Sequence, residues 1–276
     1  MTTSARDETT AATWPLARRV VVGLAEPGGP VMAGRAFDAA GLDDGSRVVE
    51  LAPGLGLASE TVLSRDPRTW TAVEPDPLAA EHLRRSRAAR GGLPIPGREA
   101  PTQTRHVVEA PVTATGLEDG SATVVVIDSL LSTLPDPADR RAVLTEAVRL
   151  LRTGGRVAIH DLAFAPDADP DAPADLAAAG IHPLAEDELR AEVEAVGMVV
   201  VGSLVGALHL PPVHEVMREA GPRLGLKITR GVALDGGLRT AAIAGKHALP
   251  RRAVSLRSLV VVGEVPLILG MRRPRR

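Results

Sequence analysis

The stretch V-V-E-L-A-P-G-L-G-L-A-S, Val48 to Ser59, decides the fold, because an apolar run breaks there into a glycine-rich turn. The run predicts a buried β-strand, and Gly54 and Gly56 give the backbone the freedom that a tight strand-to-helix turn needs. A turn of this kind holds either the pyrophosphate of a dinucleotide or a smaller adenosine-bearing cofactor that has no phosphate. The residues around the turn have to decide which ligand it holds.

Apolar runs bounded by turn residues recur along the chain, with helix-like segments between them. This alternation predicts a doubly wound α/β fold with a largely parallel sheet. The predicted strands are 47–52, 71–74, 106–110, 122–128, 156–161, 198–204 and 258–270. The predicted helices are 77–90, 137–152 and 185–196, with one or two more in 13–41, broken at 26–30. Residues 166–175, rich in proline and aspartate, predict a solvated loop.

The connection between the sixth and seventh predicted strands is unusually long, at about fifty residues, where most connections have only a few. It includes a helix-like stretch at 212–225 and a glycine-rich middle. We therefore predict a small inserted subdomain in this part of the chain.

The composition restricts the classes of function. The 32 Lys and Arg residues nearly balance the 34 Asp and Glu residues, so no global basic field attracts nucleic acid or an anionic membrane. There is no Cys, which removes disulfides, thiolate metal sites and cysteine nucleophiles. The sequence shows no signal-peptide pattern and no apolar run of about 18 residues, which predicts a soluble cytoplasmic protein without membrane or nucleic-acid partners.

The acid inside the first strand distinguishes between the two ligands of the turn. A dinucleotide fingerprint has a third glycine where Ser59 stands, and an acid about twenty residues on, where Glu74 stands. Glu50 lies four residues before Gly54, at a position that a dinucleotide enzyme usually keeps apolar. A cofactor with a cationic amino-acid end would instead favour a carboxylate there. Glu50 therefore indicates S-adenosylmethionine.

Four motifs follow one another in the order of a known family. They are E-L-A-P-G-L-G (50–56), A-V-E-P-D (72–76), V-E-A-P (108–111) and, before the fifth strand, L-R-T-G-G (151–155). Together they resemble the class I S-adenosylmethionine-dependent methyltransferases over residues 26–205, most closely the small-molecule and quinone-type enzymes. The resemblance implies a Rossmann-like doubly wound seven-stranded sheet in which strand 7 is antiparallel, with N-terminal helices and an insertion between strands 6 and 7.

The resemblance also implies which residues hold the cofactor. Glu50 would hold the amino-acid end of S-adenosylmethionine, Glu74 the ribose diol, and the segment from Glu109 the adenine. The glycine pair at 28–29 would lie near the cofactor. The full implied set is Gly29, Glu50, Ala52, Gly54, Gly56, Glu74, Pro75, Glu109, Ala110, Asp128 and Ser129.

The same resemblance divides the chain into four parts. Residues 1–44 would form a helical cap, 45–209 the cofactor-binding core, 210–257 an inserted substrate cap, and 258–276 the last strand with a basic tail. An insertion between the sixth and seventh strands would overhang the carboxyl edge of the sheet, where ligands bind in open α/β folds. It would form the roof of the acceptor pocket, lined by Leu208, Leu210, Val213 and Met217.

The acceptor chemistry is less defined than the cofactor site. The turn after the fourth strand lacks the His pair often found in this group, and Ser132 and Thr133 stand there. No catalytic residue is assigned; the candidates are His160, Asp161, His209 and His214. No metal is expected, because Leu162 follows Asp161 where the catechol-type enzymes have Asn, and two carboxylates make a poor magnesium cage.

The expected function is methyl transfer to a small molecule at an undetermined O, N or C atom, with a homodimer as an open oligomeric state. Two alternative functions remain: a nicotinamide-dependent oxidoreductase, and a non-catalytic module that binds S-adenosylmethionine. A nucleic-acid methyltransferase is disfavoured, because the amino type needs Pro-Pro-aromatic after the fourth strand and the carbon-5 type needs a Cys.

Overall fold

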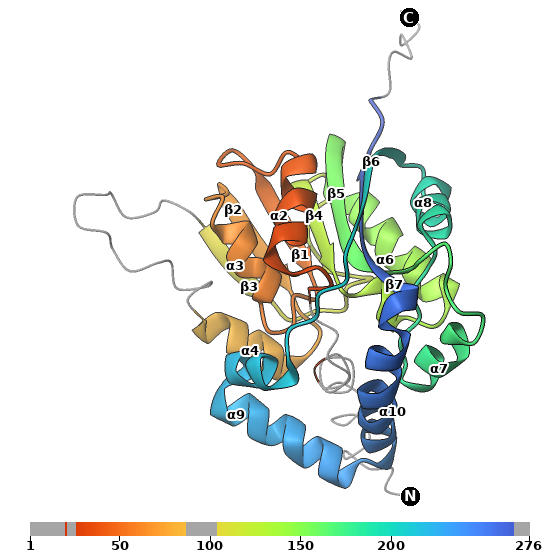
Figure 1. The fold of residues 1–276 in the computed structure, drawn as a ribbon. Helices are drawn as coiled ribbons and strands as arrows, with labels where there is room; N and C mark the ends of the chain where they lie inside the picture. Colours follow the sequence, from red (N-terminus) through yellow and green to blue (C-terminus); the bar gives the residue numbers. More distant parts are fainter. Residues whose placement is uncertain (1–19, 21–25, 87–103, 268–276) are drawn as a thin grey trace, which may run out of the picture.

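The fold is a seven-stranded sheet covered on both faces by helices, as Figure 1 shows. The computed structural model describes Val20, residues 26–86 and residues 104–267. The strands lie in the order β3-β2-β1-β4-β5-β7-β6. They are β1 (Arg47–Leu51), β2 (Thr69–Val73), β3 (Thr104–Val108), β4 (Ala122–Asp128), β5 (Leu151–Phe164), β6 (Val199–Gly206) and β7 (Leu256–Glu264).

The direction of the last strand agrees with the expected fold. Strands β1 to β5 pair in parallel, whereas β7 lies between β5 and β6 and pairs antiparallel with both. The predicted seven-stranded sheet with strand 7 antiparallel is thus confirmed.

The two faces of the sheet bury alternate side chains of each strand. On one face, Val48 and Val126 pack with helices α2 (Gly29–Ala39), α3 (Leu57–Leu63) and α4 (Pro77–Arg85). On the other, Val49 and Ile127 pack with α6 (Pro137–Leu150) and α8 (Glu186–Ala195). Because the central strands are buried on both faces, their polar residues stand out as candidates for function.

Several predicted elements differ from the structure. Strand β5 begins at Leu151, inside the helix predicted over 137–152, and β7 ends at Glu264. Residues 172–175, predicted as loop, begin helix α7 (Ala172–Ala178), because Ala172 and Leu176 are buried against α10 (Gly236–Arg252). The helix predicted over 77–90 ends at Arg85, where the backbone of Ser86 turns extended. The predictions for 13–19, 21–25, 87–90 and 268–270 lie outside the described residues.

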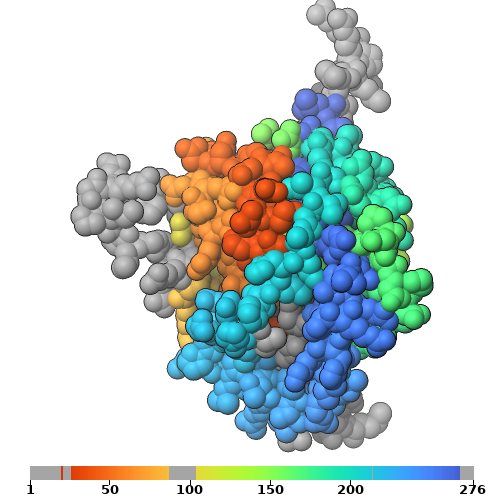
Figure 2. Space-filling model, in the orientation of Figure 1, coloured from red at the N-terminus to blue at the C-terminus, as the bar shows by residue number. Residues whose placement is uncertain are grey.

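The connection between β6 and β7 forms two helices, α9 (Val213–Leu234) and α10 (Gly236–Arg252), followed by the short helix η2 (Ala253–Ser255). The glycine-rich middle is therefore helical. Helix α9 is kinked at Gly221, which has φ 68° and precedes Pro222. Such a kink follows from proline, which removes a backbone donor and clashes with the preceding turn. Figure 2 shows α9 and α10 at the lower end of this face, below α2 and α3.

Helix α9 packs directly over the glycine turn that follows β1. Val216, Leu224 and Ile228 share a buried cluster with Leu55 of the turn and Ala79 of α4. Helix α10 packs instead on α7, where Arg252 donates to Asp175 at 2.8 Å. None of the helices within the described ranges is both long and apolar enough to cross a membrane.

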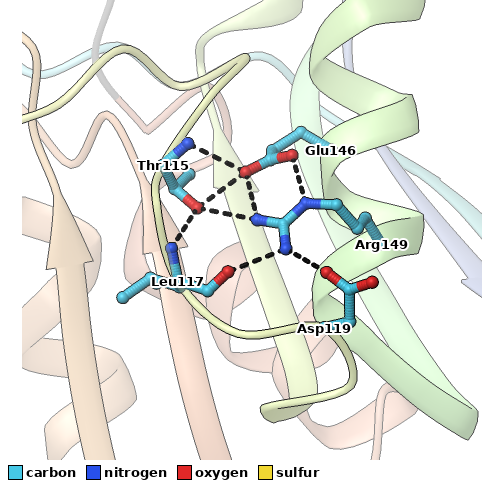
Figure 3. A network of polar contacts seen from close by, with 5 residues as sticks. All are labelled: Thr115, Leu117, Asp119, Glu146 and Arg149. Carbon is cyan, nitrogen blue, oxygen red and sulfur yellow. Dashed lines mark hydrogen bonds and ion pairs between the residues drawn. The ribbon is translucent and has the colours of Figure 1, made fainter.

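The loop between β3 and β4 is tied to α6 by the polar network in Figure 3. Glu146 accepts hydrogen bonds from the backbone nitrogen of Thr115 at 2.9 Å and its hydroxyl at 2.6 Å. Arg149 donates to Glu146 at 2.7 Å and to the carbonyl of Leu117 at 2.7 Å. The bonds from Arg149, followed by those from Thr115, lower the pKa of Glu146 to about 2, although burial opposes the shift.

Replacing Glu146 by alanine should lower the free energy of unfolding at pH 7 by about 1–2 kcal/mol, since a buried backbone donor loses its acceptor. The depressed pKa makes this contribution full above pH 4.5, and it disappears as the pH falls through about 2. Urea unfolding at pH 7 and pH 3 measures the difference. Asp119→Ala is the control, because its side chain is 82% exposed and the change should stay within about 0.5 kcal/mol. Equal losses in the two variants would contradict the prediction.

Candidate functional site

The glycine turn after β1 has the backbone of a ligand-binding loop. Gly54 and Gly56 have φ of 63° and 80°, values that residues with a β-carbon rarely adopt. Ala52 also has a positive φ of 50°, a strained value for a residue with a β-carbon. Ala52, Gly54 and Gly56 together form the tight strand-to-helix turn that the sequence predicts.

Glu74 lies at the carboxyl end of β2 and is 3% exposed. Its carboxylate accepts from the backbone nitrogen of Gly54 at 2.8 Å and from that of Asp76 at 2.9 Å. These two bonds fix the carboxylate beside the glycine turn, at the edge of the sheet where open α/β folds bind ligands. A carboxylate in this place suits a ribose diol, whose two hydroxyls are donors.

Glu50 is fully buried on the face of β1 that α3 covers. One carboxylate oxygen accepts from the hydroxyl of Ser59 and from the indole nitrogen of Trp70, each at 2.8 Å. Ser59 is the residue at the third glycine position of the motif, so its hydroxyl serves to anchor Glu50. This anchoring of Glu50 could not be predicted from the sequence, because Ser59 and Trp70 lie 9 and 20 residues away from it.

Asp128 and His160 form a buried pair at the carboxyl ends of the neighbouring strands β4 and β5. The Nδ1 atom of His160 lies 2.6 Å from Asp128, and its Nε2 atom lies 2.7 Å from the carbonyl oxygen of Pro27. Burial disfavours the charged ring, but the Asp128 carboxylate outweighs it and raises the pKa of His160. Ser129 donates to Asp128 at 2.7 Å. His160, proposed as a candidate base, thus has both ring nitrogens engaged and holds the segment before α2.

Asp161, another of the catalytic candidates, faces away from this pair. It accepts from the backbone nitrogen of Ser132 at 3.1 Å, from its hydroxyl, and from the backbone nitrogen of Leu162 at 2.7 Å. Complete burial raises its pKa, and the bonds from Ser132 oppose the shift. These contacts hold the short helix η1 (Leu131–Thr133) against β5, so the geometry gives Asp161 a structural role.

The remaining candidates are spread around the carboxyl edge. The side chain of His214 is 69% exposed at the start of α9. His209 is exposed, its carbonyl accepts from Gly28 at 2.8 Å, and its ring lies against Gly29. Glu109 lies 3.7 Å from Arg84 in a half-exposed ion pair. Pro75 and Ala110 are partly buried beside these acids.

Glu26 lies among the candidate site residues, although the sequence did not indicate it. It is only 8% exposed and lies in the turn 26–28 that precedes α2. Burial, followed by the nearby Asp128 carboxylate, raises the pKa of Glu26 to about 8. The close approach of Gly28 to Ser258 explains why this turn needs glycine, because a β-carbon would collide with the serine side chain. The sequence feature that could have indicated Glu26 is a carboxylate beside a glycine pair. Without knowledge of the fold, this feature predicts only a helix break.

The described residues contain no cluster of three or more His, Asp or Glu side chains that could hold a metal ion. The glycine turn, the Glu74 carboxylate and a group of buried acids lie together at one edge of the sheet.

Comparison with known proteins adds a family to this geometry. Residues 49–159 match the family model described as a methyltransferase domain. A protein of Mycolicibacterium smegmatis, named provisionally as an O-methyltransferase, is 34% identical over 154 residues, which are 53% of this chain and 67% of that protein. A Mycobacterium tuberculosis strain H37Rv protein named a probable O-methyltransferase is 34% identical over 126 residues, 45% of this chain and 50% of that one. The chain thus spans about half the length of most relatives it matches.

Solved structures share the fold at low sequence identity. The crystal structure of the [4+2]-cyclase SpnF aligns with a TM-score of 0.65 at 12% identity, over 94% of both chains. Geranyl diphosphate C-methyltransferase from Streptomyces coelicolor A3(2), solved with S-adenosyl-L-homocysteine, aligns with a TM-score of 0.53 at 13% identity, over 85% of this chain and 76% of that one.

Proposed function

Because the chain belongs to the class I S-adenosylmethionine-dependent methyltransferases, we propose that it transfers the methyl group of S-adenosylmethionine to a small-molecule acceptor. One observation carries the proposal: the Glu74 carboxylate is fixed beside the positive-φ turn by the backbone nitrogen of Gly54. The buried acids Glu50 and Glu26 fit a ligand whose amino-acid end carries an ammonium group.

The cofactor supplies a methyl group already activated on a sulfonium, so the protein contributes binding, orientation and exclusion of water. Glu74 and the turn would hold the adenosine part, with the segment from Glu109 at the adenine. Glu50 would hold the amino-acid end, with Asp128 and Ser129 beside it. This division explains why a cofactor site is well defined in the sequence while no catalytic base is.

We propose that residues 210–257 form the acceptor cap. The packing of α9 on Leu55 supports this role, because it brings the insertion over the turn that would hold the cofactor. Met217 packs in the same cluster, whereas Leu208 and Leu210 pack with α7 and α10. The names of the mycobacterial relatives favour an oxygen acceptor.

Isothermal titration calorimetry with S-adenosylhomocysteine and NADH tests the cofactor. The former should bind at micromolar strength and the latter should not. Binding of NADH alone would favour the oxidoreductase. Incubation with labelled S-adenosylmethionine and a panel of phenols, amines and quinones then tests turnover. Cofactor binding without turnover of any acceptor would favour the non-catalytic module, and the neighbour named a cyclase is a reason to make this test.

Turnover of an identified acceptor should survive chelation, because neither Asp128 nor Asp161 leaves a carboxylate open for magnesium: one pairs with His160 and the other with Ser132. The measurement is the initial rate with and without EDTA. A rate that falls in EDTA and returns with magnesium would refute the metal-free mechanism.

The oligomeric state, the lack of nucleic-acid binding and the cytoplasmic location stay predictions. A homodimer is supported by the edge strand β6, which exposes Val199, Val201 and Val205. Light scattering should give the molar mass of a dimer for the unchanged protein and that of a monomer for Val201→Lys, since a charged edge strand resists pairing.

A further inference from the structure

Three acids from separate parts of the chain meet at the carboxyl ends of the central strands. Glu50 comes from β1, Asp128 from β4 and Glu26 from the turn before α2; they are 0%, 5% and 8% exposed. The Oε1 atom of Glu26 is buried and has no hydrogen-bond partner within the described part of the chain. A buried acceptor of this kind is costly unless a ligand satisfies it.

The turn that carries Glu26 is held at two points. His160 contacts the carbonyl oxygen of Pro27 at 2.7 Å, and Gly28 donates to the carbonyl of His209 at 2.8 Å. Glu26 itself has a positive φ of 40°, which a residue with a β-carbon keeps only where its surroundings enforce it. The Glu26 carboxyl is therefore presented at a fixed place beside the other two acids.

Most of the charged groups around Glu26 are carboxylates, which disfavour its charged form. After burial, the carboxylates Asp128 of β4, Glu50 of β1 and Glu60 of α3 raise the pKa of Glu26, and His160 of β5 lowers it, with a resulting value of about 8. Of the groups with the largest effects on the pKa of Glu26, only His160 lowers it, and its Nδ1 atom already lies 2.6 Å from Asp128. At neutral pH the ligand-free protein therefore holds Glu26 mainly as the neutral acid.

We propose that Glu26 binds the α-ammonium group at the amino-acid end of the methyl donor and gives up its proton when that group arrives. This inference rests on the proposed function. The ammonium group has three N–H donors and needs more than one acceptor, so Glu50 and Glu26 can both serve it. The proton balance is simple: the neutral Glu26 acid becomes a carboxylate paired with the incoming cation, and one proton passes to the buffer.

Calorimetry in two buffers with different ionisation enthalpies counts that proton. S-adenosylhomocysteine should release close to one proton at pH 7, since a group with a pKa of about 8 is then about nine-tenths protonated. 5′-Methylthioadenosine carries the same adenosine without the amino-acid end, so it should release none. The affinity for S-adenosylhomocysteine should rise about tenfold from pH 6 to pH 7 and level off above pH 8, while that for 5′-methylthioadenosine stays constant.

Glu26→Gln is the deciding variant, because glutamine has the shape of the neutral acid and cannot release the proton. It should bind 5′-methylthioadenosine like the unchanged protein, which also shows that it folds. It should bind S-adenosylhomocysteine at least tenfold more weakly at pH 8, with no proton release and no pH dependence. Glu60→Gln is the matched control: this neighbouring acid is exposed, and its replacement should preserve the proton release.

The outcomes separate this inference from the proposed function. If the unchanged protein binds neither ligand, the proposed function fails and the inference fails with it. If both ligands bind but the proton count is the same for both, or is unaltered in Glu26→Gln, only the inference is overturned. Unchanged binding in Glu26→Gln together with lost methyl transfer would likewise overturn it, since Glu26 would then act on the acceptor.

Discussion

Replacing Asp128 by alanine should lower the free energy of unfolding by about 3–5 kcal/mol at pH 6, the cost of leaving one member of a buried ion pair alone. His160 is fully buried, and Asp128 lies 2.6 Å from its ring. The raised pKa of His160 means that the pair stabilises the fold fully below pH 6.5, the ordinary value. This stabilisation declines as the pH rises through the folded pKa, so the cost of the replacement should be smaller at pH 9.

Urea unfolding of both proteins at pH 6 and pH 9 measures these two costs. Asp167→Ala is the matched control, because its side chain is 85% exposed and its loss should change stability by less than about 0.5 kcal/mol at either pH. A cost for Asp128→Ala that is the same at pH 6 and pH 9 would show that His160 does not carry the charge of the pair.

Replacing Glu74 by alanine should weaken the binding of S-adenosylhomocysteine by about 1–3 kcal/mol, or roughly 5- to 150-fold in Kd. In the proposed complex the carboxylate accepts from the ribose hydroxyls, and its removal leaves those donors without an acceptor in a buried site. The same carboxylate accepts from Gly54 and Asp76, so the variant also loosens the turn.

Calorimetry combined with thermal unfolding separates the two effects of this replacement. Glu74→Gln keeps the shape and one acceptor oxygen and should lie between the unchanged protein and Glu74→Ala in affinity. Glu81→Ala, a half-exposed acid on the neighbouring helix α4, is the control and should bind normally. If Glu74→Ala binds with unchanged affinity, the ribose does not lie at the end of β2.

The meeting of Gly54 and Glu74 was predictable from the sequence, because the spacing alone determines where each of them lies. Gly54 follows a strand that must be central, and Glu74 ends the next strand, so their meeting at one edge follows from parallel pairing. The contact of Gly54 with Glu74 at 2.8 Å is the result. The sequence did not reveal Glu26, because its burial depends on β4 and β5, which lie about one hundred residues further along the chain.

The helix predictions failed where tertiary packing outweighs local preference. Residues 172–178 follow a run of proline and aspartate, yet they are helical because Leu176 is buried against α10. The glycine-rich start of α10 is helical because Leu238 and Ala241 find buried partners. Neither of these packing contacts could be predicted before the position of the insertion was known.

The ends of the insertion leave the sheet side by side, since Gly206 of β6 pairs with Ser258 of β7. A loop whose ends are already held by two paired strands can change length at little cost, about 0.6 kcal/mol for each doubling. The chain between them can therefore be replaced in evolution or in the laboratory while the strands and the glycine turn stay as they are. A single scaffold of this kind can acquire new acceptors by exchanging one hairpin-like module, without redesign of the part that would hold the methyl donor.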